Sequence, residues 1–215
     1  SGFLTNIRDE ALANCSEAEK LALAPITGQS LEALPAFEVK PLTGTGAQRT
    51  IAGTLAILKE NGLAGRNFEN GRNAYHASGC AQCHRFDGAG GAVGPDLSSV
   101  ASKFSIEDML EAIIEPSNVI SDQYSASIVT MNDFTEYEGI VVNHSGSEEE
   151  GRMTIYPKTL NADPIEVKTA DVTSIEASRL SQMPQGLLDA MSDGEMLDLL
   201  AYLLSRGNPA DDFFK

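Results

Sequence analysis

The run Cys80-Ala81-Gln82-Cys83-His84 decides the fold of this chain. Cys-x-x-Cys-His is the attachment signature of c-type haem. Two thiols three residues apart lie about one helical turn from each other, so both can form thioether bonds to the vinyl groups on one edge of a porphyrin. His84 then falls beneath the iron, where its imidazole can serve as the proximal ligand. The motif therefore predicts one covalent haem c, held by Cys80, Cys83 and His84.

A Cys-x-x-Cys pair has other interpretations: a redox-active dithiol, half of a zinc site, or a buried pair of thiols. A thioredoxin-like dithiol needs a βαβ context and a zinc site needs two further ligands, and the sequence shows neither near Cys80. The haem interpretation is therefore preferred. The third cysteine, Cys15, lies far from the motif in a stretch with helical spacing. We interpret it as a buried thiol, with a disulfide or ligand role as the alternative.

An iron held by His84 has a sixth position to fill, and a thioether there favours electron transfer at a raised potential. Met183 is the predicted ligand, because Ser181-Gln182-Met183-Pro184 is an irregular segment and Pro184 would stiffen the loop that presents the sulfur. Three other methionines have the helical spacing of core residues and two fall in predicted strands. The alternatives are His144, as a bis-histidine ligand, and Met109, Met131, Met153, Met191 and Met196.

A second support for the proximal histidine is the turn Gly94-Pro95-Asp96-Leu97, which begins eleven residues after Cys83. A backbone carbonyl from such a turn can accept the proton on the far nitrogen of His84, which would fix the tautomer and the ring plane. Pro95 would make the turn rigid. Gly94 and Pro95 are therefore predicted to belong to the haem site.

Two helices are predicted to flank the motif. The first spans residues 68–78 and leads into it, and the last begins at the capping box Ser192-Asp193-Gly194-Glu195. Gly71 would let the two backbones approach closely, and Tyr75 and Tyr202 could pack beside the contact. We expect these two helices to cross.

The hydrophobic period changes from helical to alternating after Pro116, which should end a helix over residues 105–115. Turn residues such as Asn132-Asp133 separate the segments that follow. The candidate strands are 124–131, 136–143, 151–157, 164–168 and 172–177. Short antiparallel strands of this kind suggest a small barrel or sandwich inserted into a helical domain.

The 215 residues carry a formal net charge of −16. Such a chain is repelled by nucleic acid and by anionic membranes, so neither is expected as a partner, whereas a basic or neutral protein is compatible. No apolar run approaches the ~20 residues that span a bilayer, and no membrane insertion is expected. Because the chain begins with Ser1 rather than Met and covalent haem is attached outside the cytoplasm, we expect a processed or excised chain from a periplasmic or otherwise extracytoplasmic protein.

These residues resemble class I cytochrome c, whose motifs occur in the same order: Gly71 and Tyr75, Cys80 to His84, Gly94-Pro95-x-Leu97, Met183-Pro184, and Tyr202-Leu203. The chain is more closely similar to the haem-binding domain of planctomycetes and verrucomicrobia over residues 64–206. The stretches that carry this similarity are VGPDLSSV, EPSNVISDQY and QMPQGLLDAMSDGEMLDLLAYLL. In that family the domain ends a long secreted protein whose earlier parts resemble sugar-dehydrogenase β-propellers and helical repeats. The resemblance implies a carboxyl-terminal fragment. The long gap between Pro95 and Met183 departs from ordinary cytochrome c.

The predicted fold class is a mainly α cytochrome c fold with an inserted small antiparallel β module, α+β overall. Residues 1–63 are expected to form a helical lead-in and an extended linker, residues 64–123 and 178–207 a discontinuous cytochrome c domain, and residues 124–177 the inserted β module.

The predicted function is monohaem electron transfer to or from a redox partner protein or a fused dehydrogenase domain, with no catalysis of its own. The alternative is a haem-based module that binds or senses a small ligand at an open sixth position. A haem enzyme such as a peroxidase ranks last, because it needs a second haem or a distal acid-base pair, and the chain has one attachment motif and three histidines.

Overall fold

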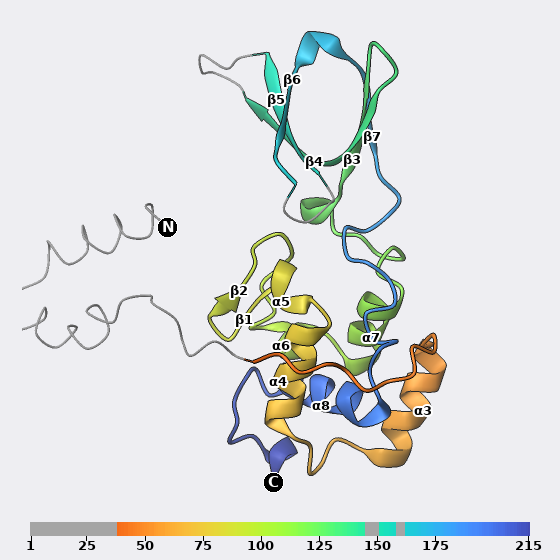
Figure 1. Ribbon diagram of the computed structural model, residues 1–215, viewed down its shortest axis with the longest axis vertical. Helices are drawn as coiled ribbons and strands as arrows, with labels where there is room; N and C mark the ends of the chain where they lie inside the picture. The colour runs from red at the N-terminus through yellow and green to blue at the C-terminus, as the bar shows by residue number, and fades with distance from the viewer. Residues whose placement is uncertain (1–37, 145–150, 158–161) are drawn as a thin grey trace, which may run out of the picture. The chain divides into compact units, whose positions relative to one another are not determined.

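The computed structural model describes residues 38–144, 151–157 and 162–215 (Figure 1). The chain divides into two compact units between Val39 and Lys40. Every helix and strand named below belongs to the second unit, Lys40–Lys215. Cys15 and the predicted helical stretch around it lie outside the described residues.

Six helices lie in this unit within the described residues. They are α3 (Ile51–Asn61), α4 (Phe68–Ala77), α5 (Cys80–Cys83), α6 (Val100–Lys103), α7 (Ile106–Ile114) and α8 (Asp193–Leu204). Of these, α3, α4, α7 and α8 begin at a side-chain cap. The predicted capping box at the start of α8 is confirmed: the Ser192 hydroxyl accepts from the backbone N–H of Glu195, and the Glu195 carboxylate accepts from the backbone N–H of Ser192 at 2.8 Å. The helices predicted at 68–78 and 105–115 are also confirmed, as α4 and α7.

The crossing of α4 and α8 is confirmed, and it occurs at Gly71. A Cβ atom at this position would lie 2.2 Å from the backbone oxygen of Asp198 and 2.8 Å from the Cβ atom of Tyr202. The rings of Tyr75 and Tyr202 pack beside the contact, with centroids 6.0 Å apart. Together with α7 these helices enclose an apolar core that includes Leu110 and Leu200, both fully buried. The absence of a side chain at Gly71 therefore sets how closely the two helices pack.

The Pro and Gly content of residues 40–50 predicts an extended linker. The segment is extended, but it is bonded to the helical part. The backbone N–H of Thr43 donates to the Glu195 carboxylate, and the guanidinium of Arg49 bonds Asp193 at 2.5 Å and the carbonyl oxygen of Met191 at 2.6 Å. These contacts fix the segment at the start of α8 before α3 begins. Polar contacts of this kind leave no periodic pattern in a sequence.

The described strands of the second half form one antiparallel sheet. They are β3 (Ser127–Met131), β4 (Glu136–His144), β5 (Arg152–Pro157), β6 (Ile165–Lys168) and β7 (Val172–Ala177), in the order β6-β5-β4-β3-β7. All five predicted strands are thereby confirmed, and only β3 starts notably later than expected, because Asp122–Tyr124 form a 3-10 turn. A short hairpin of β1 (Arg85–Phe86) and β2 (Ala89–Gly90) follows α5. Helices and sheet together make a mixed α and β structure.

The five-stranded sheet is curled, as Figure 1 shows. It has an apolar cluster of its own. Val129, Met153 and Ile155 are fully buried there. The edge strands β6 and β7 are joined by only three residues, Thr169–Asp171, which brings the two edges to within about 14 Å of each other at this end. The described residues thus form a single curled sheet instead of the two packed sheets of a sandwich.

The two ends of the sheet segment lie side by side. Ser127 at the start of β3 pairs with Ala177 at the end of β7. The backbone N–H of Ser178 donates to the carbonyl oxygen of Ala126 at 2.8 Å. A short link could therefore replace everything between these two positions.

Candidate functional site

The Cys-x-x-Cys-His motif forms one turn of helix followed by an extended residue. Gly79 precedes α5 with a φ of 85°, in the left-handed region, and His84 leaves the helix with φ −106° and ψ 138°. The backbone N–H of His84 still donates to the carbonyl oxygen of Cys80 at 2.9 Å. Cys80 and Cys83 are both free and partly buried. The turn places the two thiols and the imidazole within one short segment.

The imidazole of His84 is held by the Gly-Pro turn predicted to support it. Its Nδ1 lies 2.8 Å from the carbonyl oxygen of Pro95. A carbonyl can only accept a hydrogen bond, so Nδ1 carries the proton and Nε2 keeps the lone pair that can bind iron. A carbonyl that accepts from the other ring nitrogen fixes the orientation and tautomer of a metal-binding histidine.

Gly94 lies directly against the imidazole ring. A Cβ atom there would be 2.7 Å from Cε1 and 2.9 Å from Nδ1 of His84. The backbone N–H of Gly94 donates to the carbonyl oxygen of Cys83 at 2.8 Å, which ties the turn to the motif. A larger residue would displace either the ring or the Pro95 carbonyl. The absence of a side chain at Gly94 therefore lets the imidazole ring lie directly against the turn.

Aromatic residues support the motif from the helical side. The hydroxyl of Tyr75 donates to the carbonyl oxygen of His84 at 2.8 Å. Burial is the main cause that raises the pKa of Tyr75, so the phenol stays protonated and remains a donor. Phe86 is buried between Tyr75 and Tyr202, with ring centroids 5.6 and 5.0 Å away. The sequence predicted Tyr75 as a packing residue but not this hydrogen bond, and Phe86 was missed because a single aromatic residue has no pattern.

The two thiols lack the lowered pKa that is typical of a redox-active pair. Burial raises the pKa of both Cys80 and Cys83, whereas reactive Cys-x-x-Cys thiols have lowered pKa values. Over the ranges that the structure describes, no group of three or more His, Cys, Asp or Glu side chains could hold a metal ion. The two thiols and the imidazole of the motif therefore do not converge on one point as zinc ligands do. Separate attachment of the thiols and the imidazole to a porphyrin does not require this convergence.

The six methionines separate into five core residues and one other. Met109, Met191 and Met196 are buried in the apolar core of the helices. Met153 is buried inside the curled sheet and Met131 packs against it. Met183 belongs to neither cluster and is partly exposed in an irregular segment. Met183 is therefore the one methionine whose side chain belongs to neither apolar cluster.

His144, the alternative distal ligand, lies at the end of β4. Its Nε2 is 2.8 Å from the hydroxyl of Thr154 on the neighbouring strand β5. This contact engages one of the two ring nitrogens that could bind a metal. His144 thus already has a polar partner within the sheet.

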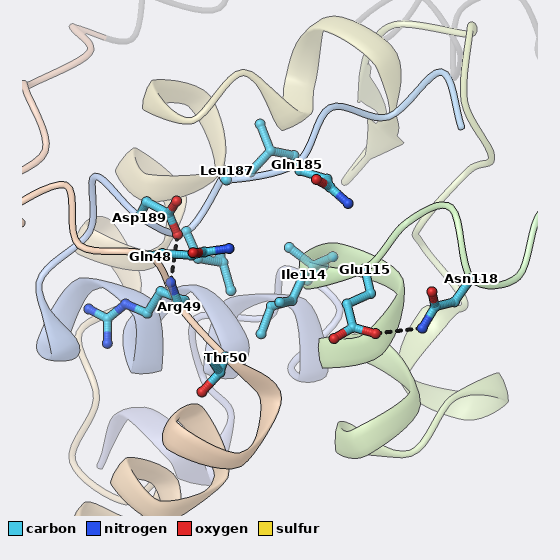
Figure 2. Close-up of a pocket in the computed structure, with 12 residues that line it drawn as sticks. Gln48, Arg49, Thr50, Ile114, Glu115, Asn118, Gln185, Leu187 and Asp189 are labelled. Atoms are coloured by element: carbon cyan, nitrogen blue, oxygen red, sulfur yellow. Dashed lines mark hydrogen bonds between the residues drawn. The ribbon is translucent and has the colours of Figure 1, made fainter. Parts of the chain in front are cut away.

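A surface pocket of about 660 Å³ lies beside the segment that follows Met183 (Figure 2). Its walls come from residues 48–50, the end of α7 with Asn118, and residues 185–189. The backbone N–H of Arg49 donates to the Asp189 carboxylate across it at 2.9 Å. The lining contains no histidine or cysteine. The hydrogen bond between Arg49 and Asp189 connects residues 185–189 to the extended segment. We interpret the pocket as the space left between these two segments and the end of α7.

Comparison with known families gives a match to the family model for cytochrome c over residues 68–136. The match contains α4, the whole Cys-x-x-Cys-His motif and the Gly94-Pro95 turn, and it ends at the first residue of β4. It supports the resemblance to class I cytochrome c, but Met183 and α8 lie outside it. No match to a curated protein is found.

The match to the cytochrome c family model implies covalently bound haem c as the cofactor, and the spacing of Cys80, Cys83 and His84 fits its attachment. The fit also holds in the geometry, because Gly94 and the Pro95 carbonyl leave Nε2 of His84 available as an iron ligand. No helix in the described part of the chain is both long and apolar enough to cross a bilayer.

Proposed function

We propose that this chain is a monohaem electron-transfer domain in which His84 and Met183 would both bind the iron of haem c. The observation that supports this choice most directly is the position of Met183, the one methionine outside both apolar clusters. Haem c, when bound, supplies a one-electron ferric/ferrous couple. The chain contributes a fixed imidazole at His84 and a thioether at Met183, which together leave no open position for a substrate. The domain itself is therefore no enzyme.

The proposal extends to the organisation of the chain. Residues 64–123 and 178–207 would form the mainly α cytochrome c fold, with residues 124–177 inserted as a β module and residues 1–63 as the lead-in. The closer relationship would be to the haem-binding domain of planctomycetes and verrucomicrobia. The protein would act in the periplasm or elsewhere outside the cytoplasm, as the carboxyl-terminal part of a longer secreted chain.

The partner would be a redox protein or a fused dehydrogenase domain. The net charge of −16 favours a partner surface that is basic or neutral. The same charge disfavours nucleic acid and anionic membranes.

Replacing Met183 with alanine tests the axial ligand. The Met183→Ala variant would be matured with haem-attachment machinery. Its weak long-wavelength charge-transfer band from sulfur to ferric iron should disappear. The reduced variant should bind carbon monoxide readily. The reason is that a thioether occupies the sixth position in the proposed site. The measurement is a pair of visible spectra, oxidised and reduced, with and without carbon monoxide.

Met191→Ala is the control for this test, since Met191 is buried in the core. It should cost about 2–5 kcal/mol of unfolding free energy and keep the sulfur band. An unchanged spectrum in Met183→Ala would transfer the assignment to His144 or another methionine. Ready binding of carbon monoxide by the unaltered chain would instead support the alternative, a ligand-binding or sensing module.

Replacing residues 127–177 with a short Gly/Ser linker tests the proposed insertion. The shortened chain should keep the spectrum of a His/Met haem, because Ala126 and Ser178 are already adjacent and the apolar cluster of the sheet is separate from that of the helices. Visible spectra and far-ultraviolet circular dichroism would be compared with those of the full chain. Loss of the sulfur band with helices still folded would make the sheet part of the haem pocket.

A further inference from the structure

The segment between β7 and α8 is held by a series of hydrogen bonds to serine hydroxyls. The backbone N–H of Ser181 donates to Oγ of Ser117 at 3.0 Å, and the backbone N–H of Met183 donates to Oγ of Ser181 at 3.1 Å. Ser117 follows α7, sixty-four residues earlier in the chain. Two hydroxyls thus hold the backbone just before and at Met183.

Both flanks of this segment are also fixed. On the sheet side, Oγ of Ser178 donates to the Glu138 carboxylate at 2.6 Å, and Ser178 is buried. On the helical side, Asp189 accepts from the backbone N–H of Arg49, as Figure 2 shows. The bond from Ser181 to Ser117 lies between these anchors and connects the segment to the end of α7. The local position of Met183 therefore depends on Ser117 and Ser181.

We infer that Ser117 and Ser181 are positioning residues that set where the thioether of Met183 is presented; this inference rests on the proposed axial role of Met183. The methionine side chain is long and flexible, so its sulfur can remain at one place only if its backbone is fixed. A thioether is a weak ligand that exogenous imidazole can displace. A looser backbone should therefore shift this competition towards imidazole.

The test measures binding of imidazole to the ferric haem of the matured full chain. Ser117→Ala and Ser181→Ala should each bind imidazole about 3- to 10-fold more tightly than the unaltered chain, as the loss of one hydrogen bond implies. Ser117→Thr keeps a hydroxyl and should restore the original affinity. The intensity of the sulfur band at room temperature should fall in the two alanine variants and return in Ser117→Thr.

Ser205→Ala is the matched control. Ser205 is buried and its hydroxyl donates to the carbonyl oxygen of Tyr202 at 2.8 Å, at the end of α8 and away from the Met183 segment in the chain. Its removal should lower the unfolding temperature and leave imidazole affinity unchanged. If both alanine variants bind imidazole no more tightly than Ser205→Ala does, the positioning role is wrong. If Ser117→Ala does not accumulate as folded protein, Ser181→Ala decides the matter alone.

The result with Met183→Ala separates this inference from the proposed function. If Met183→Ala loses the sulfur band but the serine variants behave like Ser205→Ala, only the positioning role fails. If Met183→Ala leaves the spectrum unchanged, the proposed ligation fails and the serine inference fails with it.

Discussion

Replacing Cys80 and Cys83 together with alanine is expected to abolish covalent haem attachment completely. Both thioether bonds would be lost, and His84 alone could hold the porphyrin only through the iron. Each chain matured with haem-attachment machinery would be extracted with acid and weighed by mass spectrometry. The unaltered chain should carry the mass of one haem, and the double variant the mass of the bare polypeptide.

Cys15→Ala is the control for this prediction, because Cys15 lies far from the motif in the chain. It should retain one covalent haem. If the unaltered chain has the mass of the bare polypeptide after expression with haem-attachment machinery, the haem assignment is wrong. A haem that survives acid extraction in the double variant would place the attachment elsewhere.

The parts of the site that the sequence predicted are those governed by short-range geometry. The Cys-x-x-Cys-His spacing corresponds to one helical turn, and α5 has that form. The contact between His84 and the Pro95 carbonyl could be predicted because a glycine-proline turn has few conformations. The assignment of Met183 stays a prediction, although its position outside both apolar clusters agrees with it.

The fold was predictable where hydrophobic periodicity is strong. The five strands were recognised from alternating residues, since one face of the sheet buries an apolar cluster. The sequence left a barrel and a sandwich open, and the structure has a single curled sheet. The three-residue link at Thr169–Asp171 and the contacts of Asn132 beside it were not predicted. The Asn132 side chain donates to the carbonyl oxygen of Ala170 and accepts from the Thr173 hydroxyl. Single polar contacts of this kind do not alter the hydrophobic pattern.

The course of residues 40–50 and the serine contacts before Met183 could not be predicted for the same reason. Arg49 and Asp193 are 144 positions apart, and Ser117 and Ser181 are 64 apart. A charged or hydroxyl side chain has many possible partners at such separations. Only the folded structure shows which one it meets.

Gly71→Ala is expected to destabilise the fold strongly, although it adds only one methyl group. The new Cβ atom would lie 2.2 Å from the backbone oxygen of Asp198, inside the crossing of α4 and α8. Backbone cannot rotate away as a side chain can, so the helices would have to separate and weaken the contacts of Tyr75 and Tyr202. Overpacking typically costs about 1–3 kcal/mol and occasionally more, and a clash with backbone should lie at the upper end of this range. Urea unfolding of the matured protein would measure it.

Gly194→Ala supplies the control, because Gly194 lies in the first turn of α8 and a Cβ atom there would meet no atom within 4 Å. This change should leave stability unaltered or raise it by up to about 1 kcal/mol, since alanine loses less backbone entropy than glycine in a helix. The contrast between two glycines of crossing helices removes the general effect of the substitution. Equal unfolding free energies in the two variants would mean that α4 and α8 do not approach as closely as the Gly71 contact requires. A large loss of stability confined to Gly71→Ala would show that the close packing of α4 against α8 requires the space that glycine leaves for the Asp198 carbonyl.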